Sequence, residues 1–132
     1  MIVIDASAEV AVLLGIGLEV ERIRERIARP GETLHVPHLF EIEVLHALRG
    51  LSLRGTISPE RSSLALSRLS DTQFTRYPHT TLMGRVWDMR ENLTAYDAAY
   101  VVLAEALNAP LVTTDAKLAR TPGIRAAVEV YG

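Results

Sequence analysis

Several residue types that build common functional sites are missing or scarce in this chain of 132 residues. There is no cysteine, so disulfide frameworks, thiol catalysis and cysteine-ligated zinc or iron–sulfur sites are excluded. Lysine and arginine number 14 against 16 aspartates and glutamates, and this formal charge of −2 excludes a protein that coats nucleic acid by bulk positive charge. No apolar run approaches the roughly 20 residues of a membrane span, and no basic leader precedes the first apolar run, so we expect a cytoplasmic protein without membrane contact.

Familiar catalytic motifs are also absent. The sequence has no glycine-rich phosphate loop, no Gly-x-Ser-x-Gly nucleophile motif and no His-Glu-x-x-His zinc motif. Ser7 has no histidine near it in the sequence, so a hydrolase triad is unsupported. The chemistry must therefore come from other residues.

What the chain does have is a regular alternation of short apolar runs and longer helical periods. The length and the hydrophobic content of 48% predict one globular domain over residues 1–132. Because helix-length segments separate the predicted strands, the crossovers should be right-handed and the sheet mostly parallel, with helices on both faces in an α/β/α sandwich. The predicted strands are residues 2–4, 34–37, 74–77, 111–113 and 128–131.

Three of the five aspartates lie at the ends of predicted strands or helices. Asp5 comes directly after the first strand, Asp115 follows the strand at 111–113, and Asp97 lies in the first turn of a helix that begins at Thr94. In parallel α/β folds, ligands bind at the carboxyl ends of the strands. Each aspartate also has a simpler interpretation as a helix cap. The helix after Asp97 is apolar all round and therefore buried, where a carboxylate needs a cation or hydrogen-bond donors.

The predicted helix over residues 38–53 adds two glutamates, Glu41 and Glu43, on opposite flanks of its main apolar stripe. Periodicity alone does not choose between them. Ile42 and Leu45 form a second apolar patch on the far side, which predicts either a protein–protein contact or a helix buried on both sides. If one glutamate meets the three aspartates, the all-oxygen cluster suits Mg²⁺ or Mn²⁺ and phosphate chemistry.

Four segments resemble the sequence motifs of PIN domains. Their order and spacing resemble those of the VapC ribonuclease toxins of VapBC toxin–antitoxin systems. These segments are residues 2–7, 36–48, 93–104 and 111–119. The resemblance selects Glu43, six residues after Pro37, over Glu41. It implies four metal-site and catalytic acids, which are Asp5, Glu43, Asp97 and Asp115. Ser7 and Thr113 match its supporting hydroxyl positions, with Thr114 as a possible substitute for Thr113.

The resemblance implies an endoribonuclease that uses one or two Mg²⁺ or Mn²⁺ ions to hydrolyse phosphodiester bonds. Asp5 and Asp97 are the best candidates for direct ligands, and we expect the substrate to be single-stranded or loop RNA. The implied partners are a VapB-like antitoxin and a second copy of the chain. Two alternatives remain at this stage: a PIN nuclease of RNA processing without an antitoxin, and a non-catalytic PIN-like domain whose acids only cap helices.

Overall fold

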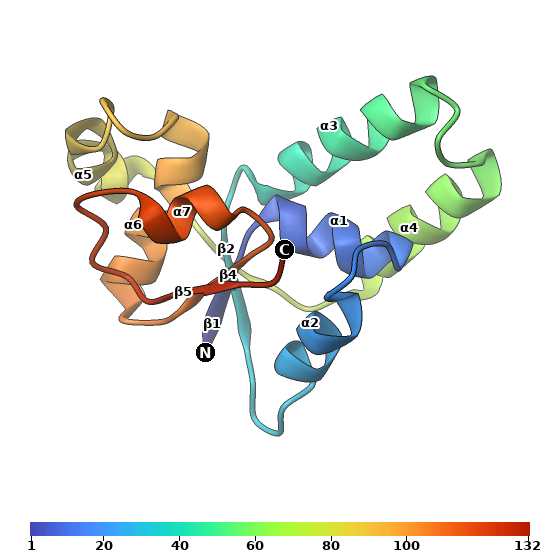
Figure 1. Cartoon of the computed structure of the whole chain (residues 1–132), viewed down its shortest axis with the longest axis horizontal. Helices are drawn as coiled ribbons and strands as arrows, with labels where there is room; N and C mark the ends of the chain where they lie inside the picture. The colour runs from blue at the N-terminus through green and yellow to red at the C-terminus, as the bar shows by residue number, and fades with distance from the viewer.

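The computed structural model describes residues 1–132 and places a five-stranded sheet at the centre of the molecule (Figure 1). The strands are β1 (Ile2–Ile4), β2 (Leu34–Pro37), β3 (Thr75–Tyr77), β4 (Leu111–Thr113) and β5 (Val128–Val130). They run in the order β3-β2-β1-β4-β5, and all pairings are parallel. β1 is central and completely buried, which explains its unbroken apolar sequence. The predicted parallel sheet is confirmed.

Helices cover both faces of this sheet and give the three predicted layers (Figure 1). The helices are α1 (Ala6–Leu14), α2 (Val20–Ile27), α3 (Phe40–Leu53), α4 (Pro59–Asp71), α5 (Met83–Asp88), α6 (Ala95–Leu107) and α7 (Ala116–Arg120). α1 packs against α2, α3 and α4 on one face, and α6 packs on β1, β2 and β4. The α3–α4 pair extends beyond the sheet as a hairpin (Figure 1).

Local sequence signals set several helix ends. Ser58 and Thr94 each cap a helix by accepting a hydrogen bond from the backbone N–H three residues further on. α1 ends at Gly15 and α6 ends at Asn108, and both residues adopt the left-handed conformation, with φ of 65° and 49°. Residues 80–90 do not form one continuous helix, because Thr80–Leu82 is a 3₁₀ turn and α5 ends at Asp88. Two adjacent β-branched threonines at its start disfavour a regular α-helical turn there.

Two expectations about burial are now decided. Residues 98–104 of α6 are buried without interruption, as its apolar circumference predicted. On α3, by contrast, Ile42 is 69% exposed and Leu45 is also exposed, so the alternative of a helix buried on both sides is wrong. Leu64 and Leu66 of α4 are exposed as well. None of the helices combines the length and the apolar composition needed to cross a membrane.

Candidate active site

The candidate site is built around Asp5, at the point where β1 ends and α1 begins. Asp5 is only 6% exposed. Its Oδ1 accepts hydrogen bonds from the Ser7 hydroxyl at 2.7 Å and from the Ala8 backbone N–H at 3.0 Å, and its Oδ2 accepts one from the Thr113 hydroxyl at 2.5 Å. Asp5 therefore caps α1, as the simpler interpretation expected, but it also accepts two side-chain hydrogen bonds that a cap does not need.

The two hydroxyls join Asp5 to the loop after β4. The Ser7 hydroxyl accepts the Thr114 backbone N–H at 3.2 Å, and the Thr113 hydroxyl accepts the Asp115 backbone N–H at 3.0 Å. Each hydroxyl thus gives its single proton to Asp5 while its oxygen is fixed by a backbone donor. Thr113 is the residue that supplies the second hydroxyl, and Thr114 contributes its backbone N–H rather than its side chain.

Glu43 and Glu41 have different surroundings, which the helical pattern did not distinguish. Glu41 forms an ion pair with Arg76 of β3, outside the cluster. Glu43 lies in the first turn of α3, and its Oε1 is buried without any hydrogen-bond partner. The Tyr100 hydroxyl is close enough to lower the pKa of Glu43 against the effect of burial, although the two groups do not meet in a hydrogen bond of normal geometry. The structure thus places Glu43 near Asp5 and Asp97, and Glu41 on Arg76.

The Tyr100 hydroxyl is a second buried polar group without a partner, and it was not expected from the sequence. Tyr100 lies on α6, one turn after Asp97. Burial, together with the charge of Glu43, raises the pKa of Tyr100, so its hydroxyl stays protonated. Its hydroxyl, placed within the otherwise aliphatic run over residues 98–104 of α6, was the available signal.

The charges of the four predicted acids act on one another. Burial is the main cause that raises the pKa of Asp5, Glu43 and Asp97. The Asp97 charge raises the pKa of Asp5 and Glu43 further, and the Asp115 charge raises that of Asp97. The four acids therefore lie near enough to influence one another's ionisation at the carboxyl edge of the sheet, and we call them the acidic cluster. Asp115 also caps α7 by accepting the backbone N–H of Lys117.

The oxygen donors of the cluster suit a hard divalent cation. The arrangement of the side chains limits how many of them ligate one ion. All its donors are carboxylate oxygens, and the unpartnered Oε1 of Glu43 is a free ligand atom. No three acidic or histidine side chains converge closely enough to ligate one ion. Mg²⁺ commonly takes one or two carboxylates and keeps several waters, so it does not require a closed cage.

Cations near the cluster are few. Lys117, the only lysine of the chain, lies close enough to Asp97 to lower its pKa. The Arg85 guanidinium is not free to bind a phosphate, because it donates to the Glu105 carboxylate and the Gly123 carbonyl. Lys117 is therefore a cation that lies beside the site.

An apolar cavity of about 330 Å³ adjoins the cluster. Ser7 and Thr114 line it on the side of the site, and Ile16, Leu18 and Tyr131 are among its apolar walls. Leu18 is 100% exposed. The loop over residues 16–18 thus forms one wall of the cavity beside the site.

This chain matches known proteins along most of its length. The family model described as PIN domain matches residues 2–124. Ribonuclease VapC9 of Mycobacterium tuberculosis is 46% identical over 121 residues, which cover 92% of this chain and 91% of the relative. Ribonuclease VapC1 of the same species is 42% identical over 123 residues, with the same shares covered.

Solved structures show the same fold. The crystal structure of PAE2754 from Pyrobaculum aerophilum has a TM-score of 0.70 and 29% identity, covering 98% of this chain and 83% of that one. A chain of VapBC2 from Rickettsia felis, bound to a DNA fragment from its promoter, has a TM-score of 0.71 over the whole length of both chains, at 15% identity. At that identity the likeness concerns the fold alone. The chain belongs to the PIN-domain family and, within it, to the VapC proteins.

Proposed function

We propose that this protein is a metal-dependent endoribonuclease and the cytoplasmic toxin of a type II toxin–antitoxin pair. The observation that carries the proposal is the acidic cluster at the carboxyl edge, where Asp5 is held by three donors and Glu43 has a free buried oxygen. The relatives named VapC ribonuclease support cleavage of RNA.

The proposed metal is Mg²⁺ or Mn²⁺, as one or two ions. Asp5 and Asp97 would bind it directly, and Glu43 and Asp115 directly or through water. When bound, the metal supplies an activated water and stabilises charge on the phosphodiester.

The chain's own residues hold this arrangement in place. Ser7 and Thr113 fix both carboxylate oxygens of Asp5, and their protons favour its ionised form against the cost of burial. The Tyr100 hydroxyl remains a proton donor beside Glu43. Lys117 is positioned to contact a phosphate next to Asp97.

The apolar cavity beside the cluster fits one base of an unpaired strand. Bases of single-stranded or loop RNA are free to leave the stack and pack on apolar and aromatic side chains. Leu18 and Tyr131 offer such a surface next to Ser7. A paired base in a duplex has no access to it, so the proposed substrate is single-stranded or loop RNA.

A VapB-like antitoxin and a second copy of the chain are the proposed partners. The VapBC2 complex supports the antitoxin. The exposed apolar side chains Ile42 and Leu45 of α3 support a protein contact, because such a patch is stabilised when it is covered. Sedimentation of the isolated chain at micromolar concentration tests the dimer, and a strict monomer would contradict it. Absence of a small antitoxin gene beside its own would favour an RNA-processing nuclease.

The nuclease itself is tested by cleavage of unstructured RNA with Mg²⁺, Mn²⁺ or a chelator. Asp97→Asn removes a proposed ligand, and Asp88→Asn is the matched control on exposed α5. We expect metal-dependent cleavage by the wild type and the control, and loss of about 100-fold or more in Asp97→Asn. Wild-type protein that cleaves nothing with either metal would favour the non-catalytic domain. Full metal-dependent activity in Asp97→Asn would show that the cluster is not the site.

A further inference from the structure

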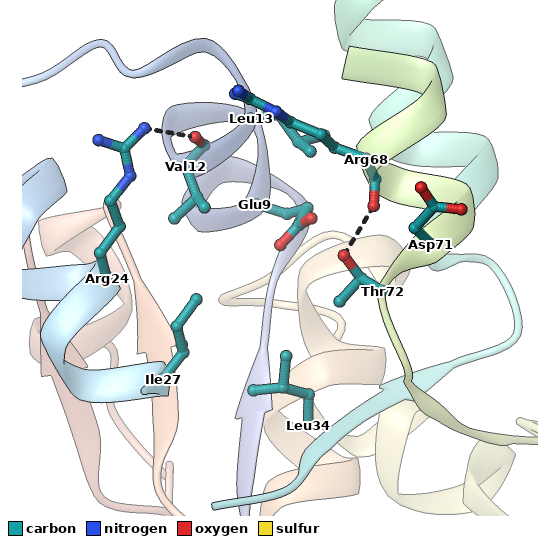
Figure 2. Close-up of a pocket in the computed structure, with 9 residues that line it drawn as sticks. All are labelled: Glu9, Val12, Leu13, Arg24, Ile27, Leu34, Arg68, Asp71 and Thr72. Carbon is teal, nitrogen blue, oxygen red and sulfur yellow. Dashed lines mark hydrogen bonds between the residues drawn. The ribbon is translucent and has the colours of Figure 1, made fainter. Parts of the chain in front are cut away.

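A second cavity lies away from the acidic cluster, on the sheet side of α1 between α2 and α4 (Figure 2). Its volume is about 600 Å³. It opens next to another cavity of about 580 Å³, with which it shares Ile27, Leu34 and Thr72. The space is therefore large enough for a side chain or a small molecule, and a longer ligand would have an exit.

Glu9 projects from α1 into this cavity (Figure 2). The residue is 2% exposed, and its carboxylate has no hydrogen-bond or ion-pair partner in the protein. Burial alone raises the pKa of Glu9 to about 7. A buried carboxylate without a partner is costly, and proteins rarely keep one unless something binds it.

Two arginines line the cavity, but neither neutralises Glu9. The guanidinium of Arg24 is held by Glu21 and donates to the Val12 carbonyl at 3.0 Å. In Figure 2 the Arg68 side chain runs over Leu13, with its guanidinium away from the Glu9 carboxylate. The protein thus supplies no cation to Glu9.

The rest of the lining suits an aliphatic stem that ends in a positive charge. Val12, Leu13, Ile27 and Leu34 provide apolar walls around Glu9. Asp71 adds a second carboxylate to the lining, on α4. Aliphatic walls with a buried acid are the complement of an amine or a guanidine on a methylene chain.

We propose that this cavity binds an alkylammonium or guanidinium group, with its charge on Glu9 and its methylene stem against Leu13, Ile27 and Leu34. The source of the group is either an arginine or lysine side chain of a protein partner or a free amine. The proposal does not depend on the nuclease activity, because the cavity shares no residue with the acidic cluster.

The test is an NMR titration of the isotope-labelled full chain at pH 8 with n-butylamine, agmatine and N-acetyl-arginine methylamide, with n-butanol as the uncharged comparison. We expect saturable shifts of the amides around Glu9, Ile27 and Thr72 with the cations. Glu9→Gln should weaken the affinity about tenfold or more, as expected for loss of a buried charged contact. Glu25→Gln, an exposed acid on α2, is the control and should bind like the wild type.

The proposal would be overturned by the absence of a saturable shift with any cation, or by equal affinities in Glu9→Gln and the wild type. Binding of n-butanol as tight as that of n-butylamine would also overturn it, because charge would then play no part. Tighter binding of the arginine derivative identifies a protein side chain as the source, and tighter binding of agmatine identifies a free amine. Thermal unfolding of Glu9→Gln checks that the variant is folded.

Discussion

Asp5 and Glu9 are two buried carboxylates one turn apart at the start of α1, and they differ in their hydrogen-bond donors. Asp5 accepts hydrogen bonds from Ser7, Ala8 and Thr113. Glu9 accepts none and faces a cavity. The fold thus supplies hydrogen-bond donors to Asp5, the buried acid of the proposed active site. It supplies none to Glu9, one turn later. The difference teaches that burial alone does not mark a catalytic acid, and that the donors around it must be counted.

The largest expected effect is the loss of RNA cleavage in Asp5→Asn, which should be much greater than the loss of stability. Asparagine caps helices as well as aspartate does, so Asp5→Asn keeps the start of α1 while removing a negative ligand. We expect metal-dependent RNA cleavage to fall by more than about 100-fold. The free energy of unfolding from urea titration should fall by no more than about 1 to 3 kcal/mol, because the amide nitrogen that replaces Oδ2 does not accept the Thr113 hydroxyl proton. An active Asp5→Asn would break the comparison, because Asp5 would then be only a cap.

Substitution of Glu9 should change the stability of the protein and leave RNA cleavage unchanged. Its pKa rises on folding from the ordinary 4.5 to about 7, so its contribution to stability is fully present below pH 4.5 and is lost as the pH rises through 7. Relative to Glu9→Gln, the wild type should lose up to about 3 kcal/mol of unfolding free energy over that range. Urea titrations at pH 4.5 and pH 8 measure this, with Glu25→Gln as control.

RNA cleavage by Glu9→Gln should equal that of the wild type. A pH-independent difference between Glu9→Gln and the wild type would contradict the unpaired state of Glu9. Loss of cleavage in this variant would remove the contrast between the two acids altogether.

Thr113→Val makes Asp5 more like Glu9, because it removes the donor to Oδ2 while keeping the shape of the side chain. Loss of a hydrogen bond to a buried charged group should cost about 1 to 3 kcal/mol of stability. Thr114→Val is the matched control, since Thr114 takes part through its backbone N–H. Equal stability of the two variants would show that the Thr113 hydroxyl does not support Asp5.

The smallest effect is expected from Leu18→Ala at the edge of the apolar cavity. Removing an exposed apolar contact to a base should raise KM a few-fold and leave kcat unchanged. Leu53→Ala, also exposed but at the far end of α3, is the control. Steady-state cleavage of a short labelled RNA measures both constants. A lowered kcat in Leu18→Ala would mean that the residue affects the chemistry rather than the substrate contact.

The sequence predicted the elements that depend on local pattern. Strand β1 follows from its apolar run, and the caps Ser58 and Thr94 follow from helix-start signals. The choice of Glu43 over Glu41 needed the family resemblance, because both flank one helical stripe. The structure distinguishes them through the partner of Glu41, which is Arg76 on β3. That contact is set by tertiary packing, which helical periodicity does not contain.

The features that the sequence did not predict also depend on packing between elements. The unpartnered hydroxyl of Tyr100 depends on how α6 meets α3. The cavity at Glu9 depends on how α1, α2 and α4 leave space above β2. A glutamate within the apolar sequence of α1 was a visible irregularity, but its surroundings could not be derived from α1 alone.

Direct Mn²⁺ binding to the full chain, measured by isothermal titration calorimetry without RNA, tests the central claim that the acidic cluster holds the metal. The wild type should bind one or two ions. The double variant Asp5→Asn and Asp97→Asn should bind none while remaining folded by circular dichroism. Equal Mn²⁺ binding by the double variant, or no binding by the wild type, would contradict the claim.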